Sequence, residues 1–298
     1  MINVDKISFG YNSKFIYNNT SLEVNKGEIF GLVGKNGAGK TTLFHLVLGI
    51  LKPDSGRIHI NGREKRTGNI IGYLPERPYY HNNFKLGEYL KYLSRISGIK
   101  VVEKDIIDVL DRVQLTEEKD NYLKNFSKGM LQRTGIAQIL LQEPKIIILD
   151  EPTSGLDPFG QKIIRDIILQ INKKGTTILL STHNLYEVNR ICHRIAMINN
   201  QKINYLDNQF VKDKSRYKIT FYDKKNYVKF KKAINTDNIL DNIQILDCEV
   251  IFPNDQIYYD ILNFLHNNQI RIKNIELISP GLEEIILEYF DEKGDNNE

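Results

Sequence analysis

The sequence predicts an α/β fold: a core with a parallel sheet and a helical insertion, an antiparallel β subdomain near the N-terminus and a small α+β domain at the C-terminal end. Two short, nearly all-apolar runs, 28–33 and 145–149, are typical of strands that a parallel sheet buries on both faces. Strand and helix patterns alternate around them, which is the βαβ order of such a sheet. After Leu206 the pattern changes, so we expect two domains, residues 1–206 and 207–298.

The first 62 residues consist of short apolar strands separated by turns. We expect strands at 20–24, 28–33 and 57–60, the last of which alternates apolar and polar residues and ends in an Asn-Gly turn. A helix pattern runs from 40 to 50. This part of the chain therefore predicts the β subdomain and the first helix of the core.

The region from about 84 to 142 is the predicted helical insertion. Apolar residues recur within 86–96 and 106–113 at spacings of three and four, which places them on one face of a helix. A third helix is expected from about 128 to 142.

Downstream of the insertion, strands and helices alternate again. We expect strands at 145–149, 176–181 and 194–198, with helices at 158–172 and 184–192. Strands joined by helices in this order belong to one parallel sheet.

The C-terminal region, 207–298, is too long to be a tail. Its polar and basic start is typical of a linker. The expected elements are a strand at 216–222, strand or helix to 252, a helix at 256–267, a strand at 269–278 and a helix at 281–290. We expect a packing extension that widens a dimer, because the region contains no cluster of convergent polar groups that would indicate a small-molecule sensor.

The composition is that of an ordinary globular protein, with 41% hydrophobic and 26% charged residues among 298. The 41 basic and 37 acidic residues leave a net charge of +4, which is too small to imply nucleic-acid binding. The two cysteines, Cys192 and Cys248, argue against a disulfide framework or a structural zinc site. Because the apolar runs are far shorter than the about 20 residues of a membrane span, and the start lacks a signal-peptide core, we expect a cytoplasmic protein.

Residues 34–41 read G-K-N-G-A-G-K-T and match the phosphate-loop pattern G-x-x-x-x-G-K-[ST]. Small residues let backbone N–H groups approach the phosphates of a nucleotide, and the helix that follows adds its positive end. Lys40 is expected at the β- and γ-phosphates, Thr41 at Mg²⁺ and Thr42 at the α-phosphate. The residues expected to bind the nucleotide here are Gly34, Lys35, Asn36, Gly37, Ala38, Gly39, Lys40, Thr41 and Thr42.

Two acids follow the second apolar strand directly. Successive side chains of a strand point to opposite faces, so the two acids can have different roles. We expect Asp150 to hold Mg²⁺ and Glu151 to orient or deprotonate the water that attacks the γ-phosphate. Together with the phosphate loop, this pair predicts ATP hydrolysis.

Three further motifs accompany the loop and the acids: N-F-S-K-G-M-L-Q-R at 125–133, S-G-L-D-P at 154–158 and S-T-H at 181–183. Their order over residues 1–206 resembles the nucleotide-binding subunit of ABC transporters, which implies a P-loop NTPase core. The run P-G-L-E-E-I-I-L at 280–287 resembles the tail of ABC ATPases that serve exporters.

The resemblance implies roles for individual residues. Ser127 and Gly129 match the signature segment, which in this family binds the γ-phosphate of the ATP held by the other subunit. Asp157 matches the loop that crosses the dimer interface, and His183 matches the histidine that senses the γ-phosphate. Tyr11 matches the aromatic residue that stacks on adenine.

The chain departs from the family's usual pattern at two places. Glu76 stands where the family usually has Gln; its oxygen is still expected to ligate Mg²⁺, but it adds negative charge beside a triphosphate. The signature reads F-S-K-G-M instead of the commoner L-S-G-G-Q, so Lys128 adds a cation and Met130 replaces a hydrogen-bonding side chain.

The resulting hypothesis is a Mg²⁺-dependent ATPase subunit that drives transport, with export favoured by the tail. Two subunits, in a homodimer or a heterodimer, would enclose two ATP molecules at the cytoplasmic face of the membrane and act on a separate integral membrane permease. No nucleic-acid partner is expected.

Two other functions remain open from the sequence. One is a soluble, non-transport ABC ATPase acting on ribosomes or DNA; such proteins usually carry two nucleotide domains or a very long coiled-coil insertion, whereas this chain has one phosphate loop and a short insertion. The other is a regulatory subunit that holds ATP without turnover, which the presence of Glu151 disfavours.

Overall fold

The computed structural model describes residues 1–12, 14–63, 70–183, 188, 190–206, 216–234, 244–246, 248–253 and 257–278. The chain divides into two compact units, residues 1–183 with 190–205, and residues 184–189 with 206–298. Within the described ranges, no helix is both long enough and apolar enough to cross a membrane.

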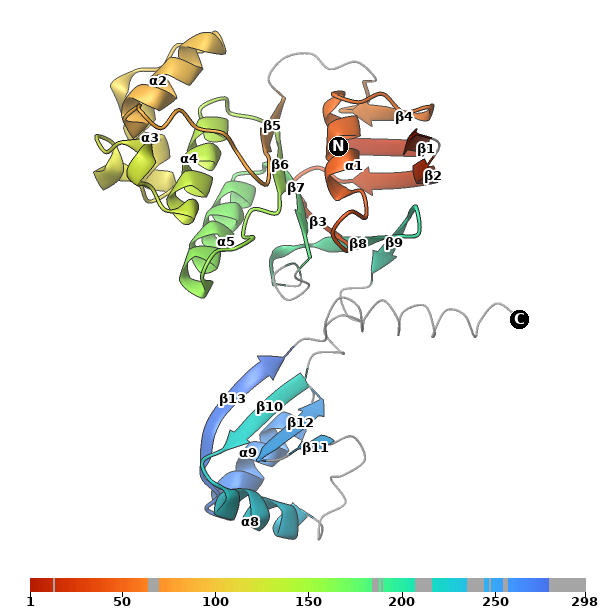
Figure 1. Cartoon of the computed structure of the whole chain (residues 1–298), viewed down its shortest axis with the longest axis vertical. Coiled ribbons are helices and arrows are strands. Elements are labelled where there is room, and N and C mark those ends of the chain that lie inside the picture. The colour runs from red at the N-terminus through yellow and green to blue at the C-terminus, as the bar shows by residue number, and fades with distance from the viewer. Residues whose placement is uncertain are drawn as a thin grey trace. The chain divides into compact units, whose positions relative to one another are not determined.

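A six-stranded sheet forms the centre of the first unit (Figure 1). Its strands, in spatial order, are β5 (Ile71–Leu74), β6 (Ile146–Asp150), β7 (Thr177–Thr182), β3 (Ile29–Val33), β8 (Arg194–Asn199) and β9 (Lys202–Leu206). The pairings from β5 through to β8 are parallel. Every residue of β3, β6 and β7 is buried, which explains the apolar run within each of them.

A second sheet of the same unit is antiparallel, with strand order β2-β1-β4. It consists of β1 (Ile2–Tyr11), β2 (Lys14–Val24) and β4 (Ser55–Ile60). Helix α1 (Lys40–Leu48) lies between this sheet and the parallel sheet (Figure 1), and side chains of all three share one hydrophobic core. The start of α1 is therefore held firmly at the end of β3.

Helices α2 (Leu86–Ile96), α3 (Glu103–Arg112), α4 (Lys128–Leu140) and α5 (Pro158–Lys173) also belong to the first unit. Helices α4 and α5 lie on the face of the parallel sheet opposite α1 (Figure 1). Helices α2 and α3 contact α4 and form the helical insertion with it. Two short 3₁₀ helices, Thr116–Glu118 and Leu123–Asn125, connect α3 to α4.

The second unit has the β-α-β-β-α-β order of a ferredoxin-like fold. Its elements are β10 (Arg216–Phe221), α8 (Lys224–Ile234), β11 (Gln244–Leu246), β12 (Glu249–Pro253), α9 (Ile257–Asn267) and β13 (Ile272–Ile278). The sheet order is β11-β12-β10-β13 and each pairing is antiparallel. The core of this unit includes Ile219, Phe221, Phe230, Val250, Phe252 and Ile261.

The predicted fold class is confirmed: a parallel α/β core, an antiparallel β sheet, a helical insertion and a small α+β unit are all present. The sequence pattern does not predict β5 and β9, because only part of each strand is buried, in contrast to β3 and β6. The predicted helix 281–290 and most of the predicted helix 184–192 and of the linker 207–216 lie outside the described residues.

Candidate nucleotide-binding site

The candidate site lies at the carboxyl edge of the parallel sheet, where three neighbouring strands end. Strand β3 leads into the loop 34–39 and then into α1, β6 ends at Asp150, and β7 ends just before His183. Because the strands are parallel, these ends meet at one edge. The fold therefore brings together the phosphate loop, the two acids and the histidine, which are distant in the sequence.

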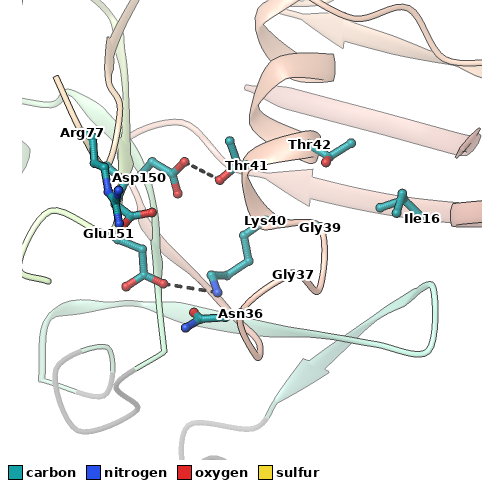
Figure 2. A pocket seen from close by; sticks show the side chains of 11 residues that line it. Ile16, Asn36, Gly37, Gly39, Lys40, Thr41, Thr42, Arg77, Asp150 and Glu151 are labelled. Atoms are coloured by element: carbon teal, nitrogen blue, oxygen red, sulfur yellow. Dashed lines mark hydrogen bonds and ion pairs between the residues drawn. The ribbon is translucent and has the colours of Figure 1, made fainter. Parts of the chain in front are cut away.

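A pocket of about 360 Å³ opens at this edge (Figure 2). It is lined by Ile16, Asn36, Gly37, Gly39, Lys40, Thr41, Thr42, Glu76, Arg77, Asp150 and Glu151. Residues of the phosphate loop thus face both acids across one cavity.

The loop needs glycine at two positions of its sharp turn into α1. Gly37 and Gly39 have φ angles of 80° and 110°, which L side chains rarely adopt. A Cβ on Gly39 would also lie 2.7 Å from Cγ2 of Ile16. The carbonyl of Gly39 accepts a hydrogen bond from the buried Tyr17 hydroxyl at 2.9 Å, which fixes the last residue of the loop.

Lys40 is buried and points along the loop toward the second acid (Figure 2). Its Nζ donates to the carbonyls of Gly34 (2.7 Å) and Lys35 (3.3 Å) and lies 3.2 Å from Oε1 of Glu151. Both charged side chains are only 7% exposed, so each needs the other to offset its lost hydration. An anion that enters the pocket would compete with Glu151 for this ammonium group.

Three hydroxyl groups surround the carboxylate of Asp150. Thr41 Oγ1 donates to Oδ2 at 2.6 Å, and Ser181 Oγ donates to Oδ1 at 2.6 Å. The Tyr73 hydroxyl also hydrogen-bonds to Asp150; burial, and then this negative neighbour, raise the pKa of Tyr73 well above its ordinary value. The first acid is therefore held in one orientation by hydrogen bonds and is only 2% exposed.

Glu151 is held in an unusual backbone conformation, with φ of 48°. A non-glycine residue in this region costs about 1–3 kcal/mol and needs support from its surroundings. Its backbone N–H donates to Ser181 Oγ at 3.0 Å, and its Oε2 lies 2.8 Å from Nδ1 of His183. The backbone turn aims the second acid into the pocket while the first faces Thr41 (Figure 2).

Glu76 and Arg77 reach the same pocket from the segment after β5. Arg77 Nε lies 3.8 Å from Oε1 of Glu76 in a largely exposed pair. Gln132 of α4 donates from Nε2 to the backbone carbonyl of Glu76 at 3.3 Å. The Tyr80 hydroxyl donates to the carbonyl of Leu131 at 2.7 Å, so this segment is attached to α4 at two points.

The other predicted nucleotide-binding residues are not among those that line the pocket. Ser127 is the exposed N-cap of α4, and its Oγ accepts from the Met130 N–H at 3.3 Å. Asp157 is the exposed N-cap of α5. Gly129 lies beside Leu156, and Tyr11 is 47% exposed and packs edge-on against Phe9.

Sequence reasoning missed several residues of the site, among them Tyr73, whose hydroxyl hydrogen-bonds to Asp150. Ile16 and Arg77 line the pocket, and Ser181 binds both acids. Ile16 carries no motif, whereas Arg77 and Ser181 stand inside segments that the sequence already singles out. Only the position of Ser181 opposite Asp150 in the parallel register distinguishes it.

The residues at the pocket fit a magnesium ion that is bound together with a nucleotide. Mg²⁺ prefers oxygen ligands and is usually bound by one or two carboxylates plus phosphate oxygens. Thr41 and Asp150 present adjacent oxygens beside the loop, and Glu76 lines the same cavity.

The loop, the helix that follows it and the two acids at neighbouring strand ends define a P-loop nucleotide-binding domain. A sequence profile described as ABC transporter matches residues 17–154. An ABC transporter ATP-binding protein of Bacillus subtilis, YhcH, is 30% identical over 97% of this chain and 95% of its own length. This chain therefore belongs to the ABC transporter family, as an ATP-binding subunit.

Two further comparisons agree. An uncharacterized ABC transporter ATP-binding protein of Synechocystis is 41% identical over 60% of this chain, and the match spans about half, 52%, of that relative's length. A solved structure of an ATP-binding subunit of an ABC transporter superposes with a TM-score of 0.61 at 30% identity, covering 70% of this chain and 91% of that one.

Proposed function

We propose that this chain binds and hydrolyses MgATP in a dimer and thereby drives transport, in the export direction, through a separate membrane permease. One observation carries the proposal: Lys40, Thr41, Asp150 and Glu151 meet at one pocket, while Ser127 lies outside that pocket at an exposed helix start. On this proposal, Lys40, Thr41, Asp150 and Glu151 form the half-site that binds the chain's own nucleotide, and Ser127 belongs to a half-site that acts on the nucleotide of a second subunit.

Nucleotide binding would rearrange the ion pair at the bottom of the pocket. A bound triphosphate would accept hydrogen bonds from the Lys40 ammonium group and from backbone N–H groups of the loop. Glu151 Oε1 would then be released from its ion pair with Lys40. Glu151 keeps its contact with His183 and can then accept the proton of the attacking water. Thr41, Asp150 and Glu76 would hold Mg²⁺, which neutralises phosphate charge when it is bound.

The second half-site is built from the start of α4. Ser127 presents a hydroxyl, the helix adds its positive end, and Lys128 adds a cation next to it. These features suit the γ-phosphate held by a second subunit. Asp157, exposed at the start of α5, would lie at the same interface.

The attachment of the Glu76 segment to α4 supports a route for transmitting the motion. Gln132 and Tyr80 link this segment to the helix that begins at Ser127. The surface from 76 to 90 and the helical insertion also expose Tyr79 (83%) and Tyr92 (41%), which suit an apolar partner. We propose that the permease contacts this surface at the cytoplasmic face of the membrane.

Substitution of Ser127 tests the dimeric site. Ser127→Phe should abolish ATP hydrolysis, because the ring blocks the approach of a phosphate, while ATP affinity of the single subunit stays at the wild-type value. Hydrolysis is measured against protein concentration, and ATP binding by titration. Ser97→Phe, at an exposed position at the end of α2, is the matched control and should keep activity. Weak ATP binding by the Ser127→Phe monomer would contradict the assignment of Ser127 to the partner's nucleotide.

Purification from the native cell tests the transport partner. A polytopic membrane protein that copurifies with the chain, and whose presence stimulates its ATPase activity, is the expected result. Copurification with ribosomes or DNA would favour the non-transport alternative, which the similarity to ABC transporter ATP-binding proteins does not support.

A further inference from the structure

Ser181 is the last-but-one residue of β7 and lies directly opposite Asp150 in the parallel register. It is fully buried. Its hydroxyl makes two hydrogen bonds: it donates to Asp150 Oδ1 at 2.6 Å and accepts from the Glu151 N–H at 3.0 Å. One hydroxyl group therefore contacts both acids of the candidate site, through the carboxylate of one and the backbone of the other.

The two hydrogen bonds use the Ser181 hydroxyl both as a donor and as an acceptor. A serine hydroxyl has one hydrogen to donate and lone pairs that can accept. Donation to Asp150 orders the carboxylate, and acceptance from Glu151 stabilises the peptide that carries the unusual φ of 48°. Alanine could do neither, and threonine could do both.

The role of Ser181 matters most when nucleotide and metal are bound. Thr41 also donates to Asp150, but it lines the pocket, so its hydroxyl would have to serve the metal ion as well as the carboxylate. Ser181 lies behind the carboxylate, on the neighbouring strand, and can keep its bond. The Asp150 side chain then stays oriented toward the pocket without Thr41.

We propose that Ser181 is a positioning residue that orients the Asp150 carboxylate for the metal and fixes the backbone of Glu151 for hydrolysis. This inference rests on the proposed ATPase function. It adds a residue whose own side chain does not line the pocket and which acts through the two acids.

The test measures metal affinity apart from turnover. Mn²⁺ is titrated by electron paramagnetic resonance into the full chain with a non-hydrolysable ATP analogue. Ser181→Ala should weaken Mn²⁺ binding and lower kcat, each by about 10–100-fold, the usual effect of losing a residue that orients a ligand. KM for ATP should stay unchanged, because the phosphate loop is intact.

Ser94→Ala is the matched control. Ser94 is also a buried serine, but its hydroxyl bonds to Leu90 within α2, remote from the pocket. Loss of that hydroxyl should lower Tm without changing Mn²⁺ affinity. If Ser181→Ala does the same, its role is structural only and the proposal is overturned.

The pair Ser181→Thr and Ser181→Val decides the outcome if the alanine variant does not fold. The two side chains have nearly the same shape but differ in one hydroxyl group. Thr should retain Mn²⁺ affinity and kcat, and Val should lose both; equal values would overturn the proposal. A wild-type chain that neither binds Mn²⁺ with the analogue nor hydrolyses ATP would instead overturn the proposed function.

Discussion

The parallel sheet of the first unit and the antiparallel sheet of the second unit use polar residues in opposite ways. In the parallel sheet of the first unit, β3, β6 and β7 end at one edge, so Lys40, Asp150 and Glu151 meet there. In the antiparallel sheet of the second unit, neighbouring strands end at opposite edges, and polar side chains pair across a face instead. Lys218 of β10 lies between Glu249 of β12 and Glu276 of β13.

The comparison teaches that strand direction decides what a set of polar residues can do. Charges at one edge of a parallel sheet face a cavity and can act together on a ligand. Charges on the face of an antiparallel sheet satisfy one another, as Lys218 does, and its pKa is raised by hydrogen bonds to Glu276 and Glu249. Polar residues in the first arrangement can form a reactive site, whereas polar residues in the second arrangement stabilise the sheet that carries them.

The largest expected effect is at the edge of the parallel sheet. Glu151→Gln should slow ATP hydrolysis by about 10²–10⁴-fold, the usual contribution of a general base. ATP binding should persist, since Lys40 and the loop are unchanged. Turnover is measured by phosphate release. Lys218→Gln, in the other sheet, is the control and should leave the rate unchanged; a normal rate in Glu151→Gln would remove Glu151 from its role.

The next prediction, with a smaller expected effect, tests whether the two units unfold separately. Phe230 is fully buried in the second core, with ring contacts to Phe221 at 5.0 Å and Phe264 at 5.8 Å. Phe230→Ala should lower the stability of the second unit by about 3–5 kcal/mol. Calorimetry should show one transition shifted downward and the other, with ATP binding, retained. Val228→Ala, exposed on the same helix, should shift neither. A common downward shift of all transitions would mean that the units unfold together.

A smaller effect concerns the contact between α4 and β5, which positions the start of α4 at Ser127. A Cβ at Gly135 would lie 2.6 Å from the Tyr80 hydroxyl and also meet Leu74. Gly135→Val should overpack this contact and cost about 1–3 kcal/mol in the first unit. Chemical denaturation measures the loss. Gln138→Val, partly exposed on the same helix, controls for the lower helix propensity of valine; equal losses would show that the glycine contact contributes nothing.

The smallest effect is at the surface of the helical insertion. Glu103 lies between Lys91 and Lys119, which is the reverse of the Lys218 arrangement. Hydrogen bonds to Lys119 and then Lys91 lower the pKa of Glu103 from 4.5 to about 2. The ionised form is therefore favoured in the folded state: its stabilisation is complete above pH 4.5 and is lost as the pH falls through about 2.

Carbon-detected NMR measures the titration of Glu103 directly. Because the group is exposed, high salt should screen both lysines and return the midpoint toward 4.5. Lys119→Gln should do the same in part. A midpoint near 4.5 at low salt would contradict the arrangement.

Local signals explain how far the sequence predicted the fold and the site. The apolar runs of β3 and β6 and the glycine spacing of the loop are local features, so the sequence predicts a strand, loop and helix at 28–50 and two acids after 149. Ile16 could not be found in this way, because it reaches the pocket only through the pairing of β2 with β1. Tyr11 matches the family's adenine-stacking aromatic residue, but its side chain is exposed and packs against Phe9.

The sequence by itself determined that this chain has a phosphate loop, an acid pair and the motif order of an ABC ATPase, because each rests on residues within a few positions of one another. Only the tertiary structure decided which side chains meet. It pairs Lys40 with Glu151 across 111 positions of chain and sets one serine hydroxyl between two acids 31 and 30 residues away. The physical reason is register: the alignment of parallel strands, which no local pattern encodes, places Ser181 opposite Asp150.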